Sequence, residues 1–325
     1  MDPDRRSAFG RRGLLIGAAA LGTTAALGAA PAAAVPAGFP TFTRLGAAMD
    51  KSTLSYAPAR KEIIFPSIRY VAGRVQNPLG AWYMYYAPHD DPGGICLAYA
   101  DSLAGPWKEY PANPIISNSW PPHYSTVPHV SSPHAVWNEA DGRIYLYFHG
   151  DNRTTRVATS TDGRSFTYGA TVLHTSMLPS DVTEASYARV FPHPTQAGVH
   201  IMLFMGNQAG TRKIFIGWSN QLASGWQFKQ QPLLSPVAGE GGQLSGPHYW
   251  SRNGGGHVVY HSGDGRIRVA HVGTSFDRDE RLGVLYTEPA ATRAAAPTFA
   301  EEDGRLYMFY EAGARSNTNI AIARA

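Results

Sequence analysis

The 325-residue sequence predicts an all-β protein, a five-bladed β-propeller of four-stranded antiparallel blades. Two compositional observations favour strands: the chain has 34 glycines and 24 prolines, which make turns, and 11% aromatic residues, which suit pleated surfaces. The third observation is an internal repeat, because one hairpin pattern recurs five times between residues 80 and 325. No long apolar helical pattern occurs after residue 37.

The repeat is clearest in the second strand of each predicted blade. A turn glycine opens each segment, and β-branched, aromatic and aliphatic residues alternate after it. The segments are GAWYMYY (80–86), GRIYLYF (142–148), GVHIMLF (198–204), GGHVVYH (255–261) and GRLYMFY (304–310). The third strands follow as GICLAYA (94–100), TRVATS (155–160), KIFIGWS (213–219), RIRVAHV (266–272) and NIAIARA (319–325).

An inner strand precedes each hairpin, and an outer strand follows the first four. The inner strands are FPSIRYV (65–71), SPHAVW (132–137), ASYARVF (185–191), SGPHYW (245–250) and AAAPTF (294–299). The outer strands are GPWKEY (105–110), RSFTYG (164–169), GWQFKQ (225–230) and LGVLYT (282–287).

The fifth blade lacks an outer strand, because the sequence stops after its third. We expect TFTRLG (41–46) to supply it, which would close the ring and remove two exposed sheet edges. The propeller then spans residues 38–325. A β-sandwich pair, or a propeller with another number of blades, would use the same hairpins.

Residues 1–37 predict a twin-arginine-type signal peptide. Arg11-Arg12 precedes a mildly apolar, Ala- and Gly-rich run, and small residues follow it in the order of an export signal. We therefore expect a secreted protein with no stable membrane anchor, and we expect it to be a monomer. Residues 38–325 carry 24 basic and 22 acidic side chains without a basic run, which argues against nucleic acid as a partner.

The single cysteine, Cys96, lies among apolar residues of a predicted strand. It cannot form an intramolecular disulfide. An apolar setting raises the pKa of a thiol, so we do not expect Cys96 to act as a nucleophile.

Two turns carry a resemblance to a known superfamily. Asp101–Trp107 (DSLAGPW), and more weakly Ser219–Trp226 (SNQLASGW), are similar to the S-L-x-G-P-W turn of five-bladed β-propeller glycoside hydrolases. That superfamily includes the arabinanase and xylosidase family 43. The resemblance implies cleavage of glycosidic bonds in a poly- or oligosaccharide by three carboxylates on the first three inner strands.

The sequence departs from that pattern at two of the three positions. Phe65 and Ser132 stand before Pro66 and Pro133, where the resemblance implies aspartates. Glu184 remains and is the expected general acid. Asp50, as a displaced first carboxylate, and Asp181 are weaker candidates.

Basic and aromatic side chains fill the predicted funnel instead. Strand alternation puts Tyr187 and Arg189 on one face. The expected catalytic residues are Glu184, His134, Tyr187 and Arg189, and the expected substrate-binding residues are Arg69, His129, His248, Tyr249, Trp120 and Arg293.

Three functions are compatible with these residues. In glycoside hydrolysis, Glu184 donates the proton, His134 lies near the water, and Arg69 and Arg189 hold the sugar. In β-elimination from a uronate-containing glycan, a polysaccharide lyase reaction, Tyr187 or His134 removes the C5 proton and Arg189 binds the carboxylate. The third function is non-catalytic sugar binding. No metal is assigned, although the resemblance allows a structural calcium ion in the central channel.

Overall fold

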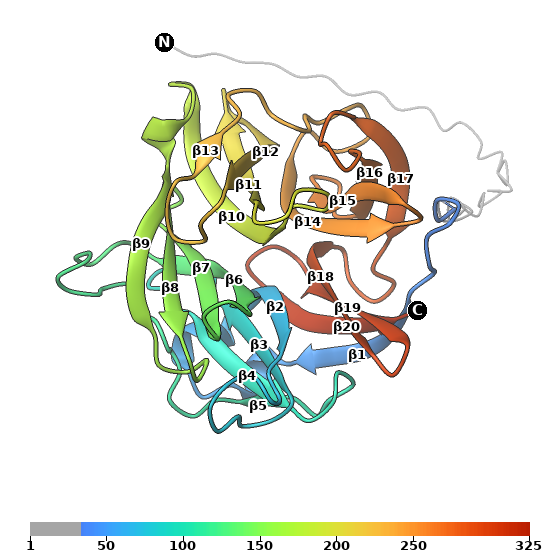
Figure 1. Ribbon diagram of the computed structural model, residues 1–325. Helices are drawn as coiled ribbons and strands as arrows, with labels where there is room; N and C mark the ends of the chain where they lie inside the picture. Colours follow the sequence, from blue (N-terminus) through green and yellow to red (C-terminus); the bar gives the residue numbers. More distant parts are fainter. Residues whose placement is uncertain (1–33) are drawn as a thin grey trace, which may run out of the picture. The chain divides into compact units, whose positions relative to one another are not determined.

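The computed structural model describes residues 34–325 as an all-β propeller with five four-stranded antiparallel sheets (Figure 1). The predicted export signal falls almost entirely on residues 1–33, which lie outside the described residues, so it stays a prediction. Blade I contains β2 (Ile64–Tyr70), β3 (Trp82–Ala87), β4 (Cys96–Ala100) and β5 (Lys108–Glu109), and blade II contains β6 (Val130–Asn138), β7 (Arg143–Gly150), β8 (Thr154–Ser160) and β9 (Thr167–His174).

The remaining blades follow in chain order. Blade III contains β10 (Val182–Pro192), β11 (His200–Gln208), β12 (Thr211–Ser219) and β13 (Gln227–Phe228). Blade IV contains β14 (Leu244–Arg252), β15 (Gly255–Ser262), β16 (Ile267–His271) and β17 (Glu280–Tyr286). Blade V contains β18 (Ala294–Glu302), β19 (Arg305–Ala312), β20 (Asn319–Arg324) and β1 (Thr43–Met49). The five predicted inner strands and the number of blades are therefore confirmed.

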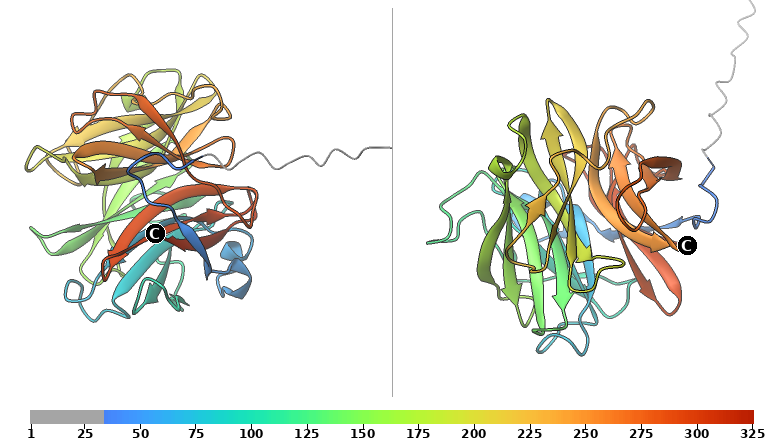
Figure 2. Two further views of the ribbon diagram at one scale, coloured as in Figure 1. Left: turned by 90° about the vertical axis from the view of Figure 1, so that its right-hand side faces the viewer. Right: turned by 45° about the horizontal axis from the view of Figure 1, so that its top comes forward.

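The sheets form a closed ring with the inner strands around its axis. Each inner strand contacts the inner strand of the next blade, and β18 contacts β2, so the cycle is complete. The core consists mainly of five apolar clusters, one at each interface between blades. Figure 2 shows the sheets packed face to face around the ring.

The N-terminal strand closes the ring, as the sequence predicts. β1 pairs antiparallel with β20, and Ala47 faces Ala321 in the register. Met49 and Ile320 from these two strands are buried in the cluster between blades V and I. The closure therefore covers the edge of β20 and also completes an interface between blades.

In the part of the chain that the structure describes, helical structure is limited to three short 3-10 segments, η1 (Lys51–Thr53), η2 (Ala57–Arg60) and η3 (Thr175–Met177). Among residues 34–325, none of these is long or apolar enough to cross a membrane.

All five inner strands contain a β-bulge at the same repeat position. Two residues of the inner strand stand opposite one residue of the second strand, and the first of the two has a positive φ. These left-handed residues are Phe65 (φ 57°), Ser132 (54°), Tyr187 (58°), Gly246 (57°) and Ala296 (44°). The residues opposite the bulges are all buried aromatics: Tyr86, Phe148, Phe204, Tyr260 and Tyr310. Because of the bulges, side chains point toward the axis that would point elsewhere in a regularly alternating strand.

We predict that removing residues 1–50 destabilises the propeller strongly, because it exposes the edge of β20 and opens the cluster around Ile320. Loss of buried apolar side chains costs about 2–5 kcal/mol each. A chain that begins at residue 34 is the control and should unfold like the full protein. Equal denaturation midpoints for the two truncated chains, measured with urea, would contradict a role for β1 in closure.

A second prediction concerns the bulge of blade IV. A Cβ on Gly246 would lie 2.9 Å from both Ala296 Cα and His261 Nδ1. Gly246→Ala should therefore cost about 1–3 kcal/mol from overpacking, in addition to about 1–2 kcal/mol for the left-handed backbone. Gly198→Ala isolates the backbone cost, because Gly198 has a φ of +77° and no atom within 4 Å of its built Cβ. Equal losses of unfolding free energy in the two variants would show that the clash has no effect.

Candidate active site

A pocket of about 510 Å³ opens at the axis where the inner strands begin. Blades I, III, IV and V supply its wall, and most of its polar side chains come from the ends of first and second strands. The polar side chains that line it are Glu62, His89, Glu184, Tyr187, Asn207, Arg212, Gln243, Ser245, His261, Ser262, Arg293, Glu311 and Arg315.

One repeat position supplies four of these residues. Each left-handed bulge residue is preceded, three positions earlier, by a polar side chain: Glu62, His129, Glu184, Gln243 and Arg293 in blades I to V. Four of the five line the pocket directly, and His129 lies behind its wall. The bulges therefore arrange a ring of polar groups that are far apart in sequence.

Glu184, the predicted acid, lies on β10 and forms an ion pair in the pocket. One carboxylate oxygen accepts a hydrogen bond from Asn207 Nδ2 at 3.0 Å, and the other accepts one from Arg212 Nη2 at 3.0 Å. About 20% of the side-chain surface of Glu184 and of Arg212 stays exposed. The carboxylate is therefore held in place and remains accessible to a ligand.

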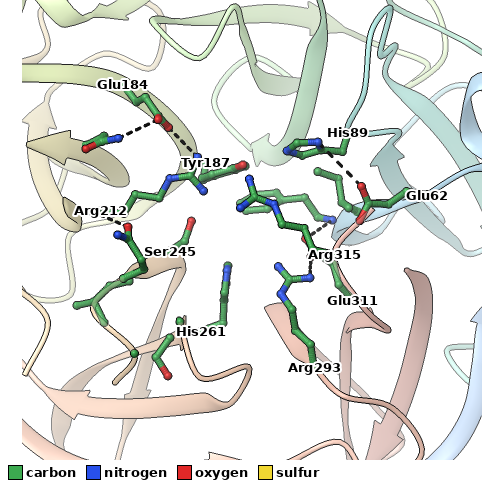
Figure 3. Close-up of a pocket in the computed structure, with 18 of the residues that line it drawn as sticks. Glu62, His89, Glu184, Tyr187, Arg212, Ser245, His261, Arg293, Glu311 and Arg315 are labelled. Carbon is green, nitrogen blue, oxygen red and sulfur yellow. Dashed lines mark hydrogen bonds and ion pairs between the residues drawn. The ribbon is translucent and has the colours of Figure 1, made fainter. Parts of the chain in front are cut away.

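Glu62 faces Glu184 from the opposite side of the pocket (Figure 3). Its Oε1 accepts hydrogen bonds from Ser316 N at 2.8 Å and Thr318 Oγ1 at 3.1 Å. Among residues 34–325, nothing donates a hydrogen bond to its Oε2, and His89 Nδ1 lies 4.0 Å away. Burial, and then the nearby carboxylate of Glu311, raise the pKa of Glu62, so burial favours its neutral form.

Apart from Glu62, the charged side chains of the pocket are three arginines, Arg212, Arg293 and Arg315, and two glutamates, Glu184 and Glu311. Arg293 Nη1 lies 2.9 Å from Glu311 Oε2, and Glu311 Oε1 accepts a hydrogen bond from Phe65 N at 3.2 Å. Arg315 also lines the pocket and forms no ion pair with any residue in the described part of the chain. With Glu62 neutral, the pocket has one positive charge more than its carboxylates balance.

A neutral imidazole and a phenol complete the chemistry of the pocket. Burial, and then Arg293 and Arg212, hold the pKa of His261 well below 6.5, so this imidazole is uncharged at neutral pH. Burial raises the pKa of Tyr187. The Tyr187 ring stacks on Phe65, with centroids 5.4 Å apart, and the two rings form the floor of the pocket.

His134 and Arg189 do not face the pocket, which corrects the prediction that Tyr187 and Arg189 share one face. Tyr187 and Ala188 form the bulge, so Arg189 points away from the pocket behind the floor. Its guanidinium lies 4.0 Å from the centre of the Phe65 ring, and its Nη1 donates to His134 Nδ1 at 3.2 Å. Arg189 and His134 are 1% and 5% exposed.

The predicted binding residues occupy five different places. Arg293 lines the pocket, whereas Arg69 and His248 lie outside it and close to Arg189, near the axis below the floor, a region called the channel from here on. His129 contacts Asn152 and His149 behind the wall, and its ring stacks near His89 at 6.4 Å.

Tyr249 and Trp120 lie away from the axis, contrary to the prediction that they contact the same substrate as Glu184. Tyr249 stacks on Phe191 at 4.5 Å between blades III and IV. Trp120 packs against Tyr168 of the outer strand β9 at 5.8 Å.

The weaker acidic candidates lie outside the pocket as well. Asp50 caps η1 by accepting a hydrogen bond from Ser52 N at 2.9 Å. Asp181 accepts a hydrogen bond from Gln208 on the surface at 3.2 Å. The buried carboxyl group of blade I is Glu62.

The sequence contains a signal for Glu62 that our prediction missed. The resemblance implied carboxylates directly before Pro66 and Pro133, whereas in blades I and III the structure places a carboxyl group three residues before the left-handed bulge residue. Glu62 and Glu184 hold this same position in blades I and III. His261 and Glu311 lie on second strands next to the bulges, facing Ser245 and Ala295, so the repeat also marks them once the register is known.

The channel below the floor does not suit the calcium ion that the resemblance allows. Calcium takes six to eight oxygen ligands, several of them carboxylates. The channel side chains Arg69, Arg189, His134 and His248 offer guanidinium and imidazole nitrogens. Within residues 34–325, no three His, Cys, Asp or Glu side chains converge as metal ligands.

The raised pKa of Glu62 predicts a pH-dependent effect of Glu62→Gln. The folded state favours the neutral form of Glu62 and so binds its proton more tightly than the unfolded state does. The contribution of Glu62 to stability is therefore complete below its ordinary pKa of 4.5, and it is lost as the pH rises through the pKa of Glu62 in the folded state. Unfolding free energies should show wild type losing stability relative to Glu62→Gln between pH 4 and pH 8. Glu139→Gln, at a side chain that is 73% exposed, should show no such trend. A constant difference for Glu62→Gln would contradict the assignment.

Comparison with known proteins supports the fold at low sequence identity. No family model and no curated protein matches the sequence. An α-L-arabinofuranosidase from Podospora anserina, solved with cellotriose, is similar over 89% of this chain and 98% of its own, with a TM-score of 0.63 and 9% identity. A β-xylosidase/α-arabinofuranosidase of family 43 from a compost metagenome, solved with xylotriose, is similar over 87% and 95%, with a TM-score of 0.57 and 14% identity.

An α-L-arabinofuranosidase from Lactobacillus brevis is similar over 80% of this chain and 89% of its own, with a TM-score of 0.56 and 15% identity. At such identities the likeness establishes the fold and leaves the reaction to be argued from the pocket. The chain therefore has the five-bladed propeller fold that these glycoside hydrolases share.

Proposed function

We propose that this protein is a glycoside hydrolase that cleaves a poly- or oligosaccharide in the axial pocket. One observation carries the proposal: two carboxyl groups at the same repeat position of blades I and III face each other across the pocket (Figure 3). One of them is buried and favoured as a neutral acid, and the other is paired with an arginine. Hydrolysis of a glycosidic bond needs such a proton donor and such a carboxylate.

In this proposal Glu62 is the general acid. Oε1 of Glu62 accepts two hydrogen bonds, from Ser316 N and Thr318 Oγ1, whereas Oε2 has no hydrogen-bond partner in the described chain. A proton on Oε2 of the neutral form is therefore free to be donated to a substrate. The proton passes from Glu62 to the oxygen of the departing sugar as the bond to C1 breaks. Glu62 then becomes a carboxylate beside His89.

Glu184 is the second carboxylate and either activates a water molecule or attacks C1 directly. Its hydrogen bonds from Arg212 and Asn207 fix its orientation. These roles reverse the expectation from sequence, in which Glu184 was the acid. The resemblance pointed to Glu184, whereas burial points to Glu62.

Arg315 supports an acidic sugar as the substrate. Its guanidinium lies at the pocket and has no carboxylate partner in the described chain, so it is able to bind a carboxylate of the glycan. We also propose that the protein is secreted through the twin-arginine-type signal of residues 1–37 and acts as a monomer. The order of arginines, apolar run and small residues supports export.

β-Elimination from a uronate-containing glycan is the second candidate function. The neutral His261 is a potential base, Tyr187 is a potential acid, and Arg315 is able to neutralise the uronate. His134 and Arg189 do not serve this reaction in our proposal, because the floor separates them from the pocket. A third outcome, binding without cleavage, would be seen as affinity without products.

We predict that Glu184→Gln and Glu62→Gln each lower kcat by about 10²–10⁴-fold, since each removes a group that transfers a proton or attacks C1. The assay follows new reducing ends and near-ultraviolet absorbance in parallel on acidic and neutral polysaccharides. Asp181→Asn, three residues from Glu184 but outside the pocket, is the matched control and should keep wild-type activity.

The product distinguishes the candidate reactions. Reducing ends without ultraviolet absorbance support hydrolysis, whereas absorbance from a C4–C5 double bond supports elimination. Full activity in both glutamine variants would refute the roles that we assign to the two carboxyl groups.

A further inference from the structure

Four basic side chains meet in the channel below the pocket floor: Arg69, His134, Arg189 and His248, called the channel cluster below. They come from the inner strands of blades I to IV. Arg189 Nη1 donates to His134 Nδ1 at 3.2 Å, and Arg189 Nη2 donates to Pro66 O at 3.0 Å. Arg69 donates from Nε to Ala135 O.

The two guanidiniums in this cluster have no carboxylate partner. Within residues 34–325, neither Arg69 nor Arg189 forms an ion pair, and Arg189 Nε has no hydrogen-bond acceptor although Arg189 is only 1% exposed. Glu311 is the carboxylate that influences Arg189, and it already pairs with Arg293 at 2.9 Å.

Both guanidiniums are charged at neutral pH. Burial and the neighbouring Arg69 lower the pKa of Arg189 to about 9, and burial and Arg74 lower the pKa of Arg69 to about 10. Burial and the two guanidiniums hold the pKa of His134 and of His248 well below 6.5, so these imidazoles are neutral. Two like charges therefore lie close together in a poorly solvated place, which is costly without a counter-charge.

Solvent reaches part of the cluster. Arg69 and His248 are half-buried, whereas Arg189 and His134 are fully buried. His248 forms no side-chain hydrogen bond with another described residue and contacts Phe299 edge-on at 5.1 Å. The cluster therefore offers free N–H donors, among them Arg189 Nε, and such donors bind anions whereas guanidiniums repel cations.

We propose that the channel cluster binds a small monovalent anion of the chloride class, held between the guanidiniums of Arg69 and Arg189. The anion balances their charge and accepts the hydrogen bond that Arg189 Nε is able to donate. It also fixes Arg189 under Phe65, and so supports the floor of the pocket from below. The site differs in charge from the calcium site that the sequence resemblance allowed.

The test measures thermal unfolding of the full-length protein, so its outcome is independent of the proposed activity. Chloride is exchanged for gluconate, a much larger organic anion, at constant ionic strength. Chloride should raise the unfolding midpoint by a few degrees and saturate with concentration, because it binds the folded state. Arg189→Met should abolish this dependence, whereas Arg143→Met, at an exposed arginine of β7, should retain it.

A second measurement keeps the proposal testable if Arg189→Met does not fold. Crystals of the wild-type protein soaked in sodium bromide should show an anomalous peak between Arg69 and Arg189. The proposal is overturned if wild type shows no chloride dependence and no bromide peak in the channel. It is equally overturned if calcium raises the unfolding midpoint, a chelator reverses this effect, and chloride has no effect.

Discussion

The pocket and the channel both depend on one backbone feature, the left-handed residue that bends every inner strand. It places two inner-strand residues opposite one buried aromatic ring, and so reverses the alternation of side chains along the strand. In four blades the residue three positions before the bend lines the pocket, and in blades II to IV the residue two positions after it lies below the floor. A small set of local backbone angles, repeated five times, thus positions the polar groups around the axis.

The floor separates two environments with different electrostatics. Above it, carboxyl groups lie among arginines, and the pairs Glu184–Arg212 and Glu311–Arg293 cancel much of the charge. Below it, guanidiniums and neutral imidazoles meet without any carboxylate among the described residues. The aromatic rings of Phe65 and Tyr187 lie between the two, and Arg189 stacks on the lower side of Phe65. Because Phe65 stands where an acid is expected, its ring insulates the upper carboxyl groups from the cations below.

The sequence predicted the architecture well because the repeat is a property of whole strands. Turn glycines and alternating apolar residues marked the five blades, and the closing strand followed from the unpaired edge of β20. The site was predicted only in part. Glu184, Tyr187 and Arg293 line the pocket. Alternation assigned Arg189 to the wrong side of the floor, and His134 was expected at the site but lies below the floor too. A positive φ at Tyr187 or Ser132, which decides both cases, has no sequence signature. Trp120 and Tyr249 illustrate a second limit, since exposure of an aromatic in a loop or strand depends on distant packing partners such as Tyr168 and Phe191.

The ring closure has a consequence for how the chain reaches its folded state. β1 is the first strand of the propeller to be synthesised and its partner β20 is the last, so blade V stays incomplete until β20 has been made. Contacts between such distant segments form late and slowly. A prematurely terminated chain would therefore retain an open sheet edge and a missing wall between blades V and I, two marks by which cellular quality control recognises unfinished products.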